Sequence, residues 1–435
     1  MGSRAPRPSS SAGLFPSAAW LAEVGRAVRV RRSETRLTVA VDVAAYWEPL
    51  TGVGRYLDSL LRHLAEREDL RLRLYGERMI DGPWAREPAA PLPTGPALDE
   101  VRYPLPAGSL LASRALHPVL SRLRSLLIAA DANRVVFAPN FYPARRFSPA
   151  LLADRAALVA TVHDLAYLRH PETVAPATRE LLGRHMGRVF FAAAAILTPS
   201  EAVRREIVAA GLAPPARVRA IHHGPGAVAA RKAGSSARPP KWAPERYALF
   251  VGTLEPRKGL ATLLAAWRRL RRAAASAVTV PDLVLAGGPG WMDESLGRAV
   301  EAGVAEGWLH RPGYVSAAEL AGLYQNASLL AVPSAYEGFG LPLLEALAAG
   351  TPVVASDLPV FREVAGDAAL FVPPGRPDRW AEEIARLLAD PALAARLAEA
   401  GRERIGVFRW ERAAEETVEA LRAAAAATAG RRQAR

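Results

Sequence analysis

The chain has 435 residues, half of them hydrophobic and 23% charged, which is typical of soluble globular proteins and long enough for two domains. It has no cysteine, which excludes disulfides, thiolate metal sites and cysteine nucleophiles. Its formal net charge of +13 favours anionic partners such as nucleotide phosphates, anionic lipid headgroups or nucleic acid, and no apolar run has the length of a membrane-spanning helix.

The first 35 residues differ in composition from the rest of the chain. Their low-complexity start, MGSRAPRPSSSAG, predicts disorder, and no signal peptide is expected because Pro16 interrupts the only apolar patch. Residues 17–32 place four apolar side chains on one helical face and most arginines elsewhere. This pattern fits a basic amphipathic helix on a membrane surface. A helix packed on the protein body, or a mis-assigned start, is the favoured interpretation.

The first half of the chain alternates predicted strands and helices. Residues 36–43 and 69–75 predict strands, and Gly52 and Gly54 precede a helix with leucines at helical spacing. Further along lie a proline-rich irregular stretch, a helical pattern and a strand that ends at Asn140: residues 81–98, 109–129 and 134–140. We expect an acceptor to be recognised by the irregular pieces, because loops usually carry specificity.

His163 ends the predicted strand 156–162, and the carboxyl end of a strand in an α/β fold is where ligands bind. From position alone, a buried and hydrogen-bonded structural histidine is the favoured interpretation, with Asp164 orienting the ring or capping the next turn of the chain. Ser200 is predicted to cap a helix that has Glu201 in its first turn. Residues 229–244 have the Gly, Ser, Pro and basic composition of an interdomain linker.

The second half opens with a buried strand, after which a loop carries Arg257 and Lys258 to the start of a helix. Two cations there oppose the helix dipole, so we expect an anion beside them. Lysine is scarce, with three in the chain, and one placed here indicates that a compact charge is needed. Later, residues 283–291 predict a strand with a glycine turn, and 313–324 a loop and a helix capped by Ser316. Another strand is predicted at 368–372, followed by helices at 377–390, 391–404 and 410–426.

Residues 333–356 carry the most specific pattern. A strand at 329–332 leads into a glycine turn, and Pro342 begins a helix that ends at Gly350. The free N–H groups and the dipole of such a helix can hold a phosphate. Glu337 lies in the loop and Glu345 is placed on the first helical turn. Because carboxylates repel phosphate, they are expected to accept hydrogen bonds from hydroxyls, and a ligand with both groups is a nucleotide sugar.

The string E-G-F-G-L-P-L-L-E-A-L-A-A-G-T-P-V-V-A-S resembles the E-x7-E signature of retaining glycosyltransferases of family 4, which have the GT-B fold. G-V-G-R-Y, V-H-D-L and G-T-L-E-P-R-K-G also resemble this family, most closely its mannosyltransferase-like branch. The resemblance implies an α/β protein with two Rossmann-like, doubly wound parallel-sheet domains that face a cleft. The expected domains are 36–228 and 245–408, followed by a helix, 409–428, that crosses back onto the first domain.

The resemblance also implies a role for each site residue. His163 would contact the donor sugar, which reverses the interpretation from position alone, and Glu337 would hold sugar hydroxyls. Glu345 would hold the ribose, and Arg257 and Lys258 would bind the diphosphate. Backbone groups would complete the donor site at the phosphate and sugar (Gly52, Gly54), at the diphosphate (Gly338, Phe339, Gly340, Leu341) and beside the nucleobase (Gly313, Tyr314, Val315).

The implied reaction is transfer of a hexose from a nucleoside-diphosphate sugar with retention at the anomeric carbon. The departing phosphate would deprotonate the acceptor, so no protein base is expected. No cofactor and no metal are expected, since the sequence lacks a D-x-D motif. GDP-mannose is the first donor candidate, before UDP- and dTDP-sugars. The expected acceptor is a glycan, lipid-linked or small molecule in polysaccharide biosynthesis, in the cytoplasm or peripherally at the inner face of the cell membrane, and no nucleic-acid partner is expected.

Three alternatives stay open from the sequence. A glycoside hydrolase would use Glu337 and Glu345 as an acid/base pair. A phosphorylase dependent on pyridoxal phosphate needs a Schiff-base lysine, and the second domain offers only Lys258. An inactive nucleotide-sugar-binding scaffold is the non-enzyme alternative.

Overall fold

The fold is taken from a computed structural model that describes residues 36–47, 52–75, 90–100, 134–140, 156–226, 237–273, 279–290 and 294–433. The predictions for residues 1–35, 81–89, 109–129 and 229–236 lie outside these ranges.

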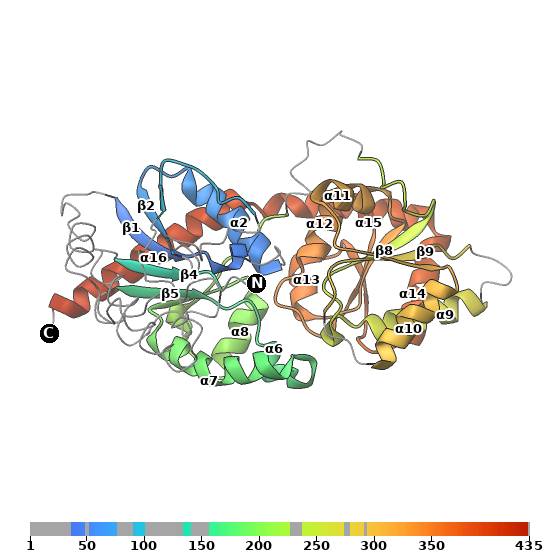
Figure 1. The fold of residues 1–435 in the computed structure, drawn as a ribbon, viewed down its shortest axis with the longest axis horizontal. Coiled ribbons are helices and arrows are strands. Elements are labelled where there is room, and N and C mark those ends of the chain that lie inside the picture. The colour runs from blue at the N-terminus through green and yellow to red at the C-terminus, as the bar shows by residue number, and fades with distance from the viewer. Residues whose placement is uncertain are drawn as a thin grey trace, which may run out of the picture.

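Two parallel sheets organise the molecule, one in each half of the chain (Figure 1). In the described residues the first sheet has seven strands in the order β3-β2-β1-β4-β5-β6-β7, all pairs parallel. The strands are β1 (Leu37–Asp42), β2 (Leu70–Tyr75), β3 (Leu98–Glu100), β4 (Val135–Ala138), β5 (Ala157–Thr161), β6 (Ala195–Thr198) and β7 (Val218–Ala220). The expected first strands are confirmed, but β3 begins inside the stretch 81–98 that was predicted to be irregular.

The second sheet has six strands in the described residues, in the order β10-β9-β8-β11-β12-β13, again all parallel. They are β8 (Tyr247–Val251), β9 (Asp282–Ala286), β10 (Leu309–Gly313), β11 (Leu329–Val332), β12 (Val353–Ser356) and β13 (Ala369–Val372). In both sheets the strand order reverses direction once, between β1 and β4 and between β8 and β11. These are the topological switch points at which doubly wound folds bind ligands.

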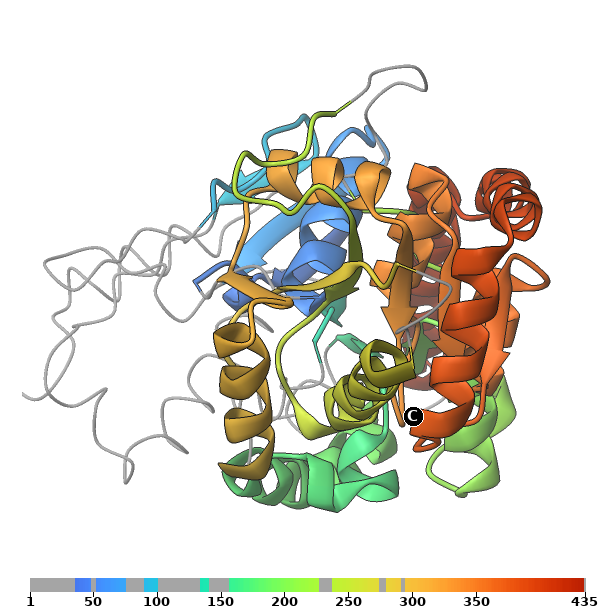
Figure 2. The ribbon, with the colours of Figure 1, turned by 90° about the vertical axis from the view of Figure 1, so that its right-hand side faces the viewer.

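Helices connect the strands and cover both faces of each sheet, as the end-on view of the second domain shows (Figure 2). In the first half they are α2 (Gly52–Ala65), α6 (Ala166–Arg169), α7 (Pro176–Ala192) and α8 (Glu201–Ala209). In the second half they are α9 (Leu260–Ala273), α10 (Glu294–Ala305), α11 (Ala317–Asn326), α12 (Leu341–Ala349), α13 (Pro359–Ala365), α14 (Pro377–Ala389), α15 (Pro391–Arg404) and α16 (Trp410–Gln433). Short 3₁₀ turns lie at 44–47, 171–173, 215–217, 256–258 and 405–407.

Alternate strand residues enter cores on opposite faces, which is why the strands read as nearly continuous apolar runs. In the second domain, Leu249 packs with the side of the sheet that α11, α12 and α13 cover. Its neighbour Phe250 packs on the other face, with α9, α10, α14 and α15. This two-sided burial confirms the doubly wound architecture predicted from the sequence.

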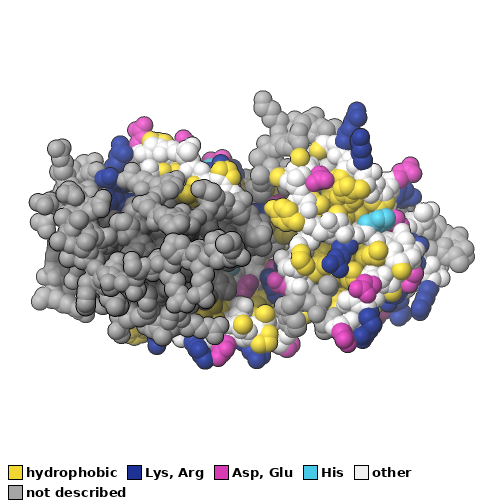
Figure 3. All heavy atoms as spheres, in the orientation of Figure 1, with side chains coloured by type: hydrophobic (Ala, Val, Ile, Leu, Met, Phe, Trp, Pro, Cys, Tyr) yellow, Lys and Arg dark blue, Asp and Glu magenta, His cyan; other side chains and the backbone are white. Residues whose placement is uncertain are grey.

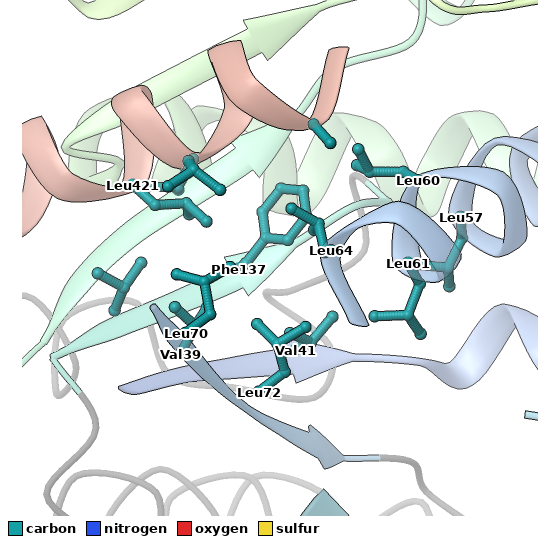
Figure 4. Close-up of a cluster of buried hydrophobic side chains, with 14 of the residues drawn as sticks. Val39, Val41, Leu57, Leu60, Leu61, Leu64, Leu70, Leu72, Phe137 and Leu421 are labelled. Carbon is teal, nitrogen blue, oxygen red and sulfur yellow. The ribbon is translucent and has the colours of Figure 1, made fainter. Parts of the chain in front are cut away.

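Helix α16 crosses back from the second domain and completes the core of the first (Figure 1). Its Leu421 lies against the same apolar cluster as Phe137 of β4 and Leu64 of α2 (Figure 4). Trp410, at its beginning, donates a hydrogen bond from Nε1 to the backbone oxygen of Pro225, at 2.7 Å. The predicted return of the last helix is therefore confirmed.

The basic charge of the chain is not gathered in one patch on the visible face of the second domain. There, arginine and lysine side chains lie among aspartate and glutamate side chains (Figure 3). Several ion pairs of the second domain lie within one helix, such as Arg386 with Glu383 on α14. Within the described ranges, no helix is both long and apolar enough to cross a bilayer.

Candidate active site

The residues with the most specific sequence pattern meet at the switch point of the second sheet. Strands β8 and β11 lie side by side, and the chain leaves them in opposite directions. The loop after β8 carries Arg257 and Lys258, and the loop after β11 carries Glu337. Because the carboxyl ends of parallel strands meet at one edge, sequence positions 80 residues apart come together there.

Backbone contacts join these two loops directly. Arg257 and Lys258 lie in a 3₁₀ turn that ends at Gly259, whose φ is 69°. A Cβ atom on Gly259 would lie 1.9 Å from the backbone oxygen of Pro333, so only glycine fits there. The N–H of Ala335 donates to the backbone oxygen of Arg257 at 2.8 Å. The two cations are thus held against the loop that carries Glu337.

Glu337 is the anion that the two neighbouring cations were expected to require. Its Oε1 lies 2.5 Å from Lys258 Nζ, and its Oε2 lies 3.4 Å from Arg257. The Ser334 hydroxyl also donates to Oε1, at 3.0 Å. Burial alone would raise the pKa of Glu337, but the charges of Lys258 and Arg257 outweigh it and hold that pKa below its ordinary value. Glu337 is therefore fixed as a carboxylate.

Arg257 and Lys258 are not fully buried. Their side chains are 20% and 14% exposed, against 10% for Glu337. Burial lowers the pKa of Arg257, but the charges of Glu337, Asp164 and Glu255 outweigh burial and raise it. The contribution of Asp164 shows that the field of the first domain reaches this cluster.

The turn after Glu337 ends in the uncapped N-terminus of α12. Gly340 is the N-cap residue, with φ of 96°, and no side chain accepts a hydrogen bond from the first turn. A Cβ on Gly340 would lie 2.7 Å from a ring carbon of Phe361. Pro342 stands in the first turn and Gly350 ends the helix, as predicted. Leu341 thus begins a helix whose positive dipole end follows closely in the chain after Glu337, the carboxylate that pairs with the two cations.

Glu345 is more deeply buried than its expected role suggested. It is the fifth residue of α12, so its placement on the first helical turn was wrong. It is 1% exposed, its Oε2 accepts a hydrogen bond from the Tyr324 hydroxyl at 2.9 Å, and its Oε1 lies 3.6 Å from Arg55 of the first domain. Burial raises the pKa of Glu345, and Arg55 and Tyr324 offset this only in part. A Cβ on Gly226 would lie 2.1 Å from Oε1.

His163 faces the same turn from the first domain. It is 9% exposed, and its Nε2 lies 2.8 Å from the backbone oxygen of Pro139. Since a carbonyl only accepts, Nε2 carries the proton. Burial lowers the pKa of His163, which favours the neutral ring. A Cβ on Gly338 would lie 1.8 Å from the His163 backbone oxygen, so the domains touch here. Asp164 Oδ1 accepts the N–H of Ala166 at 3.0 Å, just before α6, whose N-cap residue is Leu165.

The remaining predicted positions divide into near and distant ones. Gly52 and Gly54 lie within the first turn of α2, whereas they were predicted to precede it, because the helix begins at Gly52. That turn reaches the second domain through the pair of Arg55 with Glu345. Gly313 is the last residue of the edge strand β10, two strands from β8, and Tyr314 and Val315 follow it. Tyr314 is 61% exposed, and Val315 packs in the core.

The sequence reasoning missed a buried aromatic cluster between the domains. His223 lies 4.5 Å from the Tyr56 ring, 4.8 Å from Phe339 and 5.5 Å from Trp410, which it stacks on (ring-centroid distances). Its position just after β7 was the available signal. Burial, together with the charges of His163 and His222, holds the pKa of His223 well below its ordinary value.

No group of three or more His, Asp or Glu side chains in the described ranges is arranged to hold a metal ion. The chemistry that the site does offer is a fixed carboxylate, two adjacent cations and a turn that leads into a helix N-terminus. This combination suits an anionic ligand that also carries hydroxyl groups.

Comparison with known proteins agrees with this geometry. Residues 50–225 match the model of Glycosyltransferase Family 4, and residues 235–404 match that of Glycosyl transferases group 1. The O-antigen chain mannosyltransferase B of Escherichia coli is 32% identical over 394 residues, which are 86% of this chain and 96% of that protein. The D-inositol 3-phosphate glycosyltransferase of Kineococcus radiotolerans is 32% identical over 63% of this chain and 68% of its own length.

Solved structures share the fold. Sucrose-phosphate synthase from Thermosynechococcus elongatus superimposes with a TM-score of 0.66 at 24% identity, covering 90% of this chain and all of that one. Anabaena HepE in complex with UDP and glucose gives a TM-score of 0.63 at 18% identity, over 89% of this chain and all of that one. The long match to the Escherichia coli relative, the two family models and the two-sheet architecture lead to one conclusion: the chain belongs to glycosyltransferase family 4 and is a glycosyltransferase with the GT-B fold.

Proposed function

We propose that the protein transfers a hexose, mannose-like as the first candidate, from a nucleoside-diphosphate sugar with retention at the anomeric carbon. GDP-mannose is the first donor to test, followed by UDP- and dTDP-sugars. A glycan, a lipid-linked glycan or a small molecule would be the acceptor, in polysaccharide or glycoconjugate biosynthesis. The long match to a relative named as an O-antigen chain mannosyltransferase supports this choice.

The observation that carries the proposal is the cation pair at the switch point. Breaking the anomeric C–O bond leaves negative charge on the diphosphate, and stabilising that charge is the main catalytic need. Arg257 and Lys258 are partly exposed, and both pair with Glu337, in the turn that leads into α12. Preorganised charge in a site shielded from water is worth about 3–4 kcal/mol for each donor removed in comparable sites.

Glu337 fits the role of holding sugar hydroxyls. Its carboxylate is ionised and anchored by Lys258, so it accepts hydrogen bonds and has no proton to donate. Glu345 would hold the ribose hydroxyls only after Arg55 moves away, because both of its oxygens are engaged. His163 would face the sugar from the opposite domain. Gly52, Gly54 and residues 313–315 would complete the donor site through backbone groups.

The hydrolase alternative fits the geometry less well. It needs Glu337 and Glu345 on either side of a glycosidic bond. Glu337 is ionised and paired with Lys258, so it carries no proton for a general acid. Glu345 reaches no ligand while Arg55 and Gly226 lie against it. A Schiff-base role for Lys258 fits no better, because its Nζ is 2.5 Å from Glu337. The scaffold alternative is left to the transfer assay below.

Independence from metals and from cofactors is part of the proposal. It rests on the two cations, which supply at the diphosphate the charge that Mg²⁺ or Mn²⁺ supplies in other glycosyltransferases. Transfer in the presence of EDTA is the expected result. A rate that returns only when Mg²⁺ or Mn²⁺ is added would contradict it.

The test is a thermal-shift screen of the full chain against GDP-mannose, UDP-glucose, UDP-GlcNAc and dTDP-sugars. The best binder is then used in a transfer assay, with the anomeric configuration of the product read by NMR. We expect one nucleotide class to raise the melting temperature and the product to keep the donor's configuration. If no nucleotide or nucleotide sugar raises the melting temperature, the proposal fails; binding without transfer to any acceptor would favour the scaffold.

A further inference from the structure

A single carboxylate of the second domain holds the beginning of a helix of the first. Glu363, on α13, accepts hydrogen bonds from the backbone N–H groups of Glu201 at 2.7 Å and Ala202 at 2.9 Å, the first two residues of α8. The Nε2 of His222 lies 2.6 Å from the same carboxylate. These groups come from positions about 140 and 160 residues before Glu363 in the chain.

The physical basis of this contact is the positive end of a helix. The first N–H groups of any helix have no partner within it, and Ser200 already accepts from the third residue, Val203. Glu363 satisfies the two that remain in that turn. Burial raises the pKa of Glu363, but the hydrogen bonds from His222, Glu201 and Ala202 outweigh it and lower the pKa, which keeps the carboxylate charged.

Glu363 is held rigidly on its own side. The guanidinium of Arg404, from the end of α15, donates to the backbone oxygens of Val364 at 3.0 Å and of Glu363 itself at 2.6 Å. The short helix α13 is thereby joined to the end of α15 within the second domain. A rigid carboxylate facing a helix N-terminus makes the contact sensitive to the relative position of the two domains.

Helix α8 also contacts the turn between Glu337 and Gly340. The Ser200 hydroxyl, which caps α8, donates to the backbone oxygen of Gly338 at 2.8 Å. A few residues further, Glu206 of α8 accepts from the hydroxyl of Tyr336 at 2.7 Å. The placement of α8 therefore determines the orientation of the peptide groups between Glu337 and Gly340.

We propose that Glu363 is a positioning residue for glycosyl transfer: by holding the N-terminus of α8 it keeps the domains closed and, through Ser200, fixes the carbonyl of Gly338 in the turn. The hydrogen bonds of Glu363 within the described ranges join it to Glu201, Ala202, His222 and Arg404, which are not residues assigned to the donor. Its effect on transfer rests on the proposed function, whereas its effect on closure does not.

The experiment compares Glu363→Gln and Glu363→Ala with the wild type and with Glu382→Ala. Glu382 is a matched control because it is 57% exposed on α14 and pairs only within that helix, with Arg379, among the contacts described. Amide hydrogen exchange of residues 201 and 202 is measured in the full chain without ligand. Nucleotide affinity and kcat are then measured with the donor identified in the screen.

We expect exchange at both amides to be at least tenfold faster in Glu363→Ala, with kcat reduced at least tenfold and nucleotide affinity within threefold. Glu363→Gln should be intermediate, because one amide oxygen replaces two acceptors. Unchanged exchange overturns the proposal, and so does faster exchange with an unchanged kcat. Should the alanine variant not fold, the glutamine variant decides: exchange at the two amides or a kcat unchanged from the wild type overturns the proposal. If the wild type transfers no sugar, the proposed function fails, and the exchange rates alone decide whether Glu363 holds the domains.

Discussion

Replacing Lys258 by methionine tests the central electrostatic claim. The substitution keeps most of the aliphatic stem and removes the charge that lies 2.5 Å from Glu337. Glu337 keeps two partners, Arg257 at 3.4 Å and the Ser334 hydroxyl at 3.0 Å. The Glu337 carboxylate is therefore held less firmly but is not left without partners, and the variant should fold.

The structure sets the expected magnitudes. Loss of one hydrogen bond to a charged group destabilises the folded protein by about 1.5–3 kcal/mol. That is less than the roughly 3–5 kcal/mol typical of removing the sole partner of a buried charge. At the diphosphate, loss of one preorganised charge should lower kcat by about 10²–10³-fold. The effect on kcat should thus exceed what reduced stability explains, since the fold remains populated.

The free energy of unfolding of Lys258→Met should also depend on pH differently from that of the wild type. The pKa of Glu337 is lower in the folded protein than its ordinary value of 4.5, so Glu337 contributes stability above pH 4.5 that is lost as the pH falls through its folded pKa. Lys258→Met raises that pKa, so the variant should lose less stability between pH 7 and pH 4 than the wild type. Urea unfolding at the two pH values measures this difference.

The assay is kcat at saturating donor, with Lys241→Met as the control. Lys241 is another of the three lysines and is exposed outside the site. Its replacement should leave kcat within a factor of two. A Lys258→Met variant that folds, binds the nucleotide and retains kcat within threefold of the wild type would refute the claim that this cation stabilises the departing diphosphate.

Three further substitutions test other parts of the site. Gly338→Ala should lower kcat by about a hundredfold with nucleotide binding retained, because the new Cβ would lie 1.8 Å from a backbone oxygen of the first domain; Gly183→Ala, with no atom within 4 Å, is the control, and equal kcat values would contradict the close approach. Because burial raises the pKa of Glu345, the stability that the protonated side chain contributes below pH 4.5 is lost as the pH rises. Urea unfolding at pH 4.5 and pH 8 should therefore show that the free energy of unfolding of Glu345→Gln, relative to the wild type, is higher at pH 8. An equal difference at the two pH values argues against burial as the cause. Trp410→Phe removes the hydrogen bond to Pro225 and should cost about 1 kcal/mol of unfolding free energy, and no loss would mean that solvent replaces that bond.

The elements of the fold were predictable because each has a local cause. Strands buried on both faces read as apolar runs, as β11 does, and Ser200 and Ser316 cap their helices as expected. Gly340 and Gly350 both adopt positive φ at the ends of α12. Such features depend on a few neighbouring residues, so the amino-acid sequence alone reveals them.

The contacts between the domains were not predictable in this way. Glu363 lies on a short helix in a stretch with no distinctive pattern, and its partners precede it by 141 to 162 residues. Glu345 could be placed on a helix, but its burial depends on Tyr324 and Arg55, which come from separate elements. The pairing of Glu337 with Lys258 likewise required the spatial order of β8 and β11, which no single stretch of sequence specifies.

The path of α16 has a consequence for biosynthesis. This helix supplies Leu421 and other apolar side chains to the interior of the first domain, yet it is translated after the whole second domain. A nascent first domain on the ribosome therefore exposes an apolar groove where α16 will lie, while the second domain can finish folding earlier. Domains usually fold in order from the N-terminus during synthesis. Here the first domain should complete its folding only after α16 has emerged, and therefore after the second domain.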